Sequence, residues 1–467
     1  MKITKRRVRI GVEALFFDYY SGLPRDFRKT KEAWYQETLQ SLKPGFDIVD
    51  GGLVDSVQSA RESAQRLKSH NIEALLILPT MAVTSEVGLE SARICNVPLV
   101  IWNTHECDQL PAHYGVEDLV RHSSNVGTLA LCNALLRDDK RFLMTTGLPQ
   151  RANVKAEVAM HLRAASLSGL LSTLQMGLIG EAFPGMVDAN LSDDILRQNN
   201  LQPTQLVPMR ILQNSFAEIS ENKVAEEVKR MKESYSCSQL TDTSLTKSAR
   251  LALALEQLSN AYGLNGGAVN CHAKEWRMNP ELGVLGCYAV SRLTTMGIPF
   301  ACTGDLCTGL AMILAKRLGG TAFYCEVDLL DYRRGQVLLS NSGEMDFEYS
   351  RLQKEQLTAH SFYDTAAGTS VVVSGTLQEG EATLLALTPL PSSRLRLIAA
   401  LGRVQSRKAK RLPISNCVFR FERQPIERAF DEWCLGGANH HAVLIKGNLT
   451  HALKSVAYLR NWEFQEI

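Results

Sequence analysis

The unbroken apolar run at residues 74–78, Ala-Leu-Leu-Ile-Leu, constrains the fold of this chain most strongly. A run without polar alternation is typical of a parallel strand that helices cover on both faces. Strand-like segments at residues 8–14, 46–49 and 98–102 stand on either side of it, and helix-permissive segments separate them. This β-α-β-α-β order predicts a doubly wound parallel α/β sheet in the N-terminal part of the chain.

A long helix is predicted at residues 153–173, and the same alternation resumes after it. Strands are predicted at residues 176–179, 206–209 and 266–271, and a charged amphipathic helix is predicted at residues 217–234. The middle of the chain is therefore expected to form a second doubly wound α/β sheet.

The sequence changes in character after Glu326, where short apolar strands are separated by Gly, Pro and Ser. These strands are predicted at residues 337–339, 370–373, 382–387, 396–400 and 417–421. A chain of 467 residues is too long for one core. The predicted fold class is α/β, with two doubly wound parallel α/β domains at residues 1–172 and 173–324. A β-rich, barrel-like domain is predicted at residues 325–467.

Bulk properties exclude several classes of protein. A net charge of +2 gives no indication of nucleic acid or an anionic membrane as partner. Eleven scattered cysteines without a Cys-x-x-Cys pair are predicted to be reduced core residues rather than a disulfide framework or a zinc site. The first strand lacks a following Gly-x-Gly-x-x-Gly, which argues against dinucleotide binding. Without a signal peptide or a membrane-spanning run, a cytoplasmic protein is expected.

Two acidic residues stand at the ends of short apolar runs on either side of one predicted helix. Asp305 precedes the helix at residues 306–318, and Glu326 follows the next strand. Strand ends are where open α/β sheets place their ligand sites. Two carboxylates there can hold a divalent cation or move protons.

Short motifs in the same order and spacing resemble the L-fucose isomerase and L-arabinose isomerase superfamily of metal-dependent aldose–ketose isomerases. The motifs are Cys302-Thr303-Gly304-Asp305, residues 309–312, residues 320–322, Glu326, Asn341-Ser342-Gly343, residues 436–441, residues 122–127 and residues 180–186. The resemblance covers the full length. It departs from the family in two places: Thr303 replaces a metal-binding Glu, and Asn341-Ser342-Gly343 replaces a His-Cys-Gly motif.

The resemblance implies a cation, Mn²⁺ or else Mg²⁺ or Co²⁺, held by Glu326 and one histidine of the C-terminal loop. Asp305 could replace the missing ligand, and Glu326 and Asp305 are the predicted catalytic residues. Adjacent residues of a strand face opposite sides, so only one of His440 and His441 should point into the pocket. His441 is the predicted ligand.

Substrate-binding residues are predicted at strand ends and in polar loops: Trp102, Asn103, His105, Phe183, His272, Thr303 and His440. Structural roles compete with several of these functions. Asp305 also fits a helix N-cap, and Glu326 could pair with Arg333 or Arg334. His272 could be a hydrogen-bonded local histidine, or a ligand of metal rather than substrate.

The sequence therefore predicts a metal-dependent aldose–ketose isomerase that acts on a sugar or a modified sugar through an enediolate. Two alternatives stay open. A catalytically divergent sugar-binding protein of the same fold would explain Thr303, and another reaction on an anionic sugar would use nearby Arg or Lys. From the resemblance, a homo-oligomer is expected, a trimer or a hexamer, with its sites at subunit interfaces.

Overall fold

The structure is a computed structural model that describes residues 7–20, 26–237, 239–351, 356–360, 363–405 and 412–467. The chain divides into two compact units. The described residues between 7 and 171, together with residues 458–460, form the N-terminal unit, and the described residues between 172 and 457, together with residues 461–467, form the second unit. The predicted domain boundary after residue 324 lies inside the second unit and stays a prediction.

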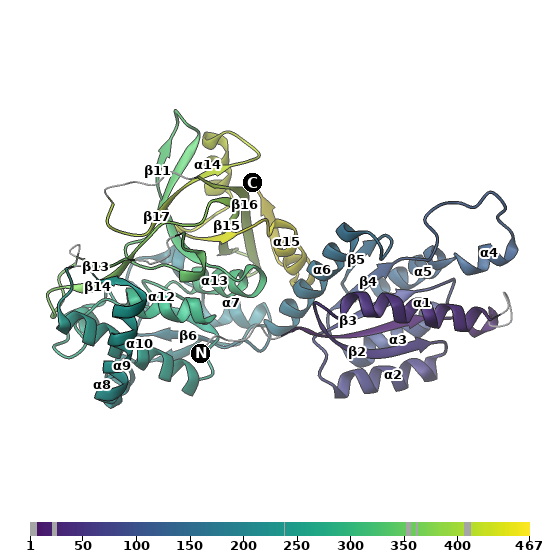
Figure 1. The fold of residues 1–467 in the computed structure, drawn as a ribbon, viewed down its shortest axis with the longest axis horizontal. Coiled ribbons are helices and arrows are strands. Elements are labelled where there is room, and N and C mark those ends of the chain that lie inside the picture. Colours follow the sequence, from purple (N-terminus) through teal and green to yellow (C-terminus); the bar gives the residue numbers. More distant parts are fainter. Residues whose placement is uncertain (1–6, 21–25, 238, 352–355, 361–362, 406–411) are drawn as a thin grey trace. The chain divides into compact units, whose positions relative to one another are not determined.

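The N-terminal unit is a five-stranded parallel sheet in the order β2-β1-β3-β4-β5. Its strands are β1 (Arg9–Leu15), β2 (Asp47–Val54), β3 (Ala74–Pro79), β4 (Leu99–Asn103) and β5 (Phe142–Thr146). Its helices are η1 (Asp18–Tyr20), α1 (Phe27–Leu42), α2 (Val57–Ser69), α3 (Ser85–Cys95), α4 (Val116–Arg121), α5 (Ser124–Arg137) and α6 (Ala152–Leu170). The predicted doubly wound sheet is confirmed (Figure 1).

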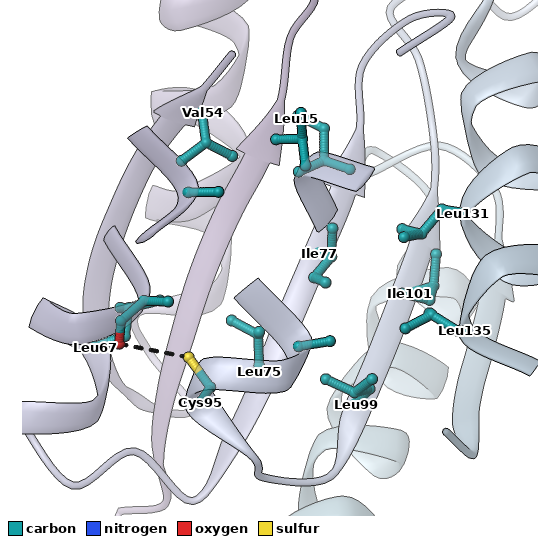
Figure 2. Packing of buried hydrophobic residues seen from close by; sticks show 14 of the residues in the cluster. Leu15, Val54, Leu67, Leu75, Ile77, Cys95, Leu99, Ile101, Leu131 and Leu135 are labelled. Atoms are coloured by element: carbon teal, nitrogen blue, oxygen red, sulfur yellow. Dashed lines mark hydrogen bonds between the residues drawn. The ribbon is translucent and has the colours of Figure 1, made fainter. Parts of the chain in front are cut away.

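Helices cover both faces of this sheet, as the apolar run at residues 74–78 predicts. Every residue of β3 and β4 is buried. Figure 2 shows one core, in which Leu75, Ile77 and Ile101 of the strands meet Leu131 and Leu135 of α5. Helices α2 and α3 complete this core, and α6 packs on β3, β4 and β5.

The second unit opens with a four-stranded parallel sheet in the order β10-β9-β6-β7. Its strands are β6 (Met176–Ile179), β7 (Gln205–Val207), β9 (Gly266–Val269) and β10 (Phe300–Ala301). Its helices are η2 (Val187–Ala189), α7 (Asp193–Gln198), α8 (Met209–Glu218), α9 (Glu221–Ser234), α10 (Asp242–Ala261), α11 (Lys274–Arg277), α12 (Cys287–Met296) and α13 (Leu306–Gly319). The second predicted α/β sheet is confirmed.

One helix prediction in this region is wrong. Residues 217–234 do not form a single helix, because Ile219 and Ser220 have extended backbones between α8 and α9. A serine followed by a glutamate is a common start signal for a helix, and α9 begins at Glu221.

The rest of the second unit is a closed β-barrel with antiparallel pairing between its strands (Figure 1). Around it run β15 (Gly380–Pro389), β18 (His441–Lys446), β11 (Phe323–Asp331), β12 (Gln336–Ser340), β17 (Asn416–Phe421) and β16 (Leu395–Gln405). Pairing of β15 with β16 closes the barrel, and β19 (Glu463–Glu466) adds to β16. Other elements are η3 (Phe347–Tyr349), α14 (Ile426–Leu435) and α15 (Thr450–Arg460). The predicted barrel-like fold is confirmed.

The strand predicted at residues 370–373 lies outside this barrel. It is β14 (Ser370–Ser374), which belongs to a small sheet with β13 (Gln356–His360) and β8 (Ser236–Cys237). The placement of β14 results from its pairing with β13, and the local pattern of residues does not predict which strands will pair.

Helix α13 joins the parallel sheet to the barrel. It packs against β9 on one side and against β15 and β18 of the barrel on the other. Its first ten residues are all buried. The start of α13 is therefore a fixed point at which residues of both sheets meet.

No helix among the described residues is long and apolar enough to cross a membrane.

Candidate active site

The loop Cys302-Thr303-Gly304-Asp305 connects β10 to α13 and has an unusual backbone. Thr303 and Gly304 both lie in the left-handed region, with φ of 55° and 74°. For a β-branched residue such as Thr303 this conformation is strained and persists only where the surroundings impose it. A side chain at Gly304 would come within 2.6 Å of the Cα of Ala182. The loop is therefore held tightly against the chain segment that carries Phe183.

Asp305 is completely buried and caps α13. Its Oδ1 accepts the backbone N–H of Thr308 at 2.8 Å, and its Oδ2 accepts the Thr308 hydroxyl at 2.6 Å. Oδ2 also accepts Nδ1–H of His441 at 2.8 Å and lies 3.3 Å from the side-chain nitrogen of Asn439. Asp305 thus serves the helix N-cap and holds His441 at the same time.

Glu326 and His441 lie opposite each other in the pairing of β11 with β18. Nε2 of His441 is 3.5 Å from Oε1 of Glu326. The His441 side chain is 2% exposed, whereas the Glu326 side chain is 52% exposed. The ring of Tyr324 packs on His441, with 4.7 Å between centroids. The three residues Asp305, His441 and Glu326 form one line from the buried helix cap to an accessible carboxylate.

The charges in this line stabilise one another. Burial alone would lower the pKa of His441, but hydrogen bonds to Asp305 and Glu326 outweigh it and raise the pKa to about 9. The hydrogen bond from His441 lowers the pKa of Glu326 against the effect of burial. Glu326 is therefore ionised at neutral pH, as a base or a metal ligand must be.

A second carboxyl group, Glu344, lies in the loop after β12. The Asn341 side-chain oxygen fixes this loop by accepting the N–H groups of Gly343 and Glu344 at 2.8 and 2.6 Å. Glu344 is buried, and desolvation together with the nearby Cys271 raises its pKa to about 8. Its charged form interacts favourably with His441. At neutral pH the Glu344 carboxyl is therefore mainly protonated, whereas the Glu326 carboxyl is ionised.

Two of the remaining predicted residues of the second unit, His440 and His272, lie near this line: both interact electrostatically with Glu326, and the ring of His440 packs against that of His441 with 3.7 Å between centroids. Nδ1 of His440 lies 2.5 Å from Asp188, so this histidine pairs with a different carboxylate from its neighbour His441. The backbone N–H of Phe183 donates to the carbonyl of Thr303 at 3.0 Å. His272 is half-buried, and its ring contacts Tyr363 with 4.6 Å between centroids.

The predicted residues Trp102, Asn103 and His105 lie in the N-terminal unit. Trp102 is fully buried, and its indole N–H donates to the Gly147 carbonyl at 3.0 Å, so its ring packs inside this unit. The side-chain nitrogen of Asn103 donates to Asn125 at 2.8 Å. Nδ1 of His105 is buried and has no hydrogen-bond partner among the residues that the structure describes. Substrate binding by these three residues stays a prediction.

The residues present fit a divalent cation. Glu326 and Nε2 of His441 offer one carboxylate and one imidazole side by side, a donor set that suits Mn²⁺ and related cations. An imidazole that binds a metal usually donates its other N–H to a carboxylate, and Asp305 occupies that place. Both oxygens of Asp305 are engaged by protein donors, so its role as a direct ligand stays a prediction.

Sequence reasoning did not assign Glu344, Tyr324 or Asp188. Glu344 directly follows Asn341-Ser342-Gly343, the segment that replaces His-Cys-Gly, and this position was the only feature of the sequence that pointed to Glu344. Tyr324 and Asp188 reach the site through tertiary packing alone, which the sequence pattern does not reveal.

A hollow of about 670 Å³ along α9 and α10 contains none of the predicted site residues.

Comparison with known proteins gives one finding. Residues 329–463 match the family model described as the L-arabinose isomerase C-terminal domain. The match spans most of the barrel and includes His440, His441 and Glu344, whereas Asp305 and Glu326 lie before it. No curated protein matches the chain. The C-terminal part of the chain is thus similar to arabinose isomerases, which supports the predicted resemblance to the arabinose and fucose isomerases.

Proposed function

We propose that this protein is a metal-dependent aldose–ketose isomerase acting on a sugar or a modified sugar. The observation that carries the proposal is the line Asp305, His441 and Glu326, located where the arabinose isomerase-like barrel meets the parallel sheet. The match to the arabinose isomerase C-terminal domain supports the class of reaction, and the carboxylate–imidazole pair supports the requirement for a cation.

Isomerisation moves a proton between two adjacent carbons and needs a base and an acid. Glu326 is ionised and half exposed, so it can accept a proton from a substrate carbon. Glu344 keeps its proton at neutral pH because of burial, so it can return one. Two carboxyl groups whose surroundings push their pKa values apart are typical of such an assignment.

His441 and Glu326 would hold the cation, and Asp305 would orient the His441 ring. When bound, the cation would polarise the substrate oxygens. The Tyr324 ring against His441 restricts movement of the imidazole. From the resemblance we further propose a cytoplasmic homo-oligomer, a trimer or a hexamer, with sites at subunit interfaces.

The direct test is a screen for isomerisation and for exchange of the C2 proton in D₂O. It covers neutral, acidic and sulfonated aldoses with chelated protein and after addition of Mn²⁺, Mg²⁺ or Co²⁺. Exchange that requires the cation is the expected result. Cation-independent turnover would refute the metal requirement.

A sugar-binding protein without catalysis is the second candidate, because Thr303 replaces the family Glu with a strained residue whose hydroxyl donates to the Cys302 carbonyl at 2.8 Å. Binding of a sugar without proton exchange under any of these conditions would favour this second candidate over the isomerase.

A further inference from the structure

Two cysteines and a histidine converge beside the candidate active site, at the ends of two neighbouring strands. Cys271 and His272 follow β9, and Cys302 follows β10, which pairs with β9 in parallel. The Sγ atoms of Cys271 and Cys302 are 3.8 Å apart. One ligand atom of each residue lies within 4.8 Å of those of the other two. The three residues therefore present two thiols and an imidazole to one point.

The separation of the two sulfurs matches a tetrahedral metal centre. Two thiolates bound to zinc at about 2.3 Å lie about 3.8 Å apart when the angle between them is tetrahedral. The sulfurs are too far apart for a disulfide, and both cysteines are free thiols. No backbone movement is therefore required to bring the sulfurs to the distance that a metal needs.

The surroundings suit a closed site with one accessible side. Cys271 and Cys302 are 1% and 5% exposed, whereas His272 is half-buried and offers a route of entry. The backbone holds the cluster firmly: the Arg277 guanidinium donates to the His272 carbonyl at 3.2 Å, and the Cys302 carbonyl accepts the N–H of Asp305 at 3.1 Å. The carboxyl group of Glu344 interacts with both cysteines.

We propose that Cys271, His272 and Cys302 form a second metal site, which binds Zn²⁺ or another thiophilic divalent cation. A water molecule would take the fourth position. Soft sulfur ligands select such cations, whereas the oxygen and nitrogen donors of Glu326 and His441 suit Mn²⁺ and Mg²⁺. This site differs in chemistry from the one in the proposed isomerase, and it does not depend on that activity.

Cobalt distinguishes the two sites, because only a site with sulfur ligands gives thiolate-to-cobalt charge-transfer absorption in the near ultraviolet. Reduced, metal-stripped protein is titrated with Co²⁺ without oxygen. We expect this absorption to saturate at one equivalent and to disappear when Zn²⁺ displaces cobalt. Saturating Co²⁺ without charge-transfer absorption in the wild-type protein would overturn the proposal, whatever the result of the isomerase screen.

Variants locate the site. Cys271→Ser and Cys302→Ser should abolish the absorption, and His272→Ala, at a half-buried position, should weaken Co²⁺ binding by at least roughly tenfold. Glu326→Gln should leave the absorption unchanged. Cys417→Ser is the matched control, because Cys417 is a fully buried thiol in β17. Absorption that persists in Cys271→Ser, or that Cys417→Ser removes equally, would refute the site.

Discussion

His441 lies directly opposite Glu326 across β11 and β18, with its ring 3.5 Å from the carboxylate on one side and 2.8 Å from Asp305 on the other. Opposite residues of an antiparallel pair point to the same face of the sheet. The strand register itself therefore brings the imidazole to the carboxylate, and the helix cap fixes which ring nitrogen faces it.

Replacement of Glu326 by Gln should remove activity without unfolding the protein. The Glu326 side chain is 52% exposed, so its contribution to the stability of the folded protein is small. Loss of a general base alone lowers turnover by roughly 10²–10⁴-fold. Turnover and the melting temperature are measured together, with Asp331→Asn as control, since Asp331 is a carboxylate on the same strand that pairs with Arg334. Near wild-type turnover in Glu326→Gln would assign Glu326 a structural role.

Replacement of Asp305 by Asn tests the line behind His441. Asn remains a good N-cap for α13, but with its oxygen in the cap its side-chain NH₂ takes the place of Oδ2, and this donor cannot accept the Nδ1–H of His441 or the Thr308 hydroxyl. The free energy of unfolding should fall by about 1–3 kcal/mol, the cost of unsatisfied buried polar groups. Urea denaturation measures this change, and Asp305→Ala should lose about 1 kcal/mol more with the cap. Equal stability of wild type and Asp305→Asn would contradict the hydrogen-bonded line.

The stability of chelated protein should depend on the charge of His441. Its pKa is about 9 in the folded protein, above its ordinary value of 6.5. The protonated ring therefore stabilises the fold fully below pH 6.5, and this stabilisation is lost as the pH rises through 9. The loss is on the order of 3 kcal/mol. Thermal unfolding between pH 6 and 10 is compared with that of His441→Gln, which should show a flatter profile. Parallel profiles would exclude a charged His441.

The N-terminal unit carries an independent pH dependence in Glu13 of β1. Burial raises its pKa from 4.5 to about 7, and its Oε2 accepts the Ser63 hydroxyl at 3.2 Å. The folded state thus keeps a proton that the unfolded chain releases, and stability falls between pH 4.5 and 7. The fall is on the order of 3 kcal/mol. Glu13→Gln should be insensitive in this range and more stable than wild type at pH 8. A variant that loses stability with pH as the wild type does would disprove this account.

The sheets could be predicted from the sequence because their strands are short, apolar and separated by helices. Residues 74–78 indicated a strand covered on both faces, and β3 is such a strand. The break at Ile219 and Ser220 was missed because the helical pattern continues across it. The placement of β14 was missed because pairing with β13 is a tertiary event.

The candidate site was only partly predictable for the same reason. Asp305, Glu326 and His441 were found through the resemblance, but their mutual hydrogen bonds depend on the register of β11 with β18. The pairing of Cys271 with Cys302 joins residues 31 positions apart, which no Cys-x-x-Cys search detects. Burial of Glu344 leaves no signature in the chain, because a glutamate in a loop is ordinarily solvated.

The position of β18 between β15 and β11 has a consequence for biosynthesis. The partners Asp305 and His441 are separated by 136 positions, and β18 enters the barrel between two strands that are synthesised before it. Until the ribosome has released this strand, β11 and β15 lack their shared neighbour and α13 lacks one of its supports. A nascent or truncated chain that stops before His441 therefore carries Asp305 and Glu326 without the imidazole that joins them, and the candidate site is completed only once β18 has been synthesised.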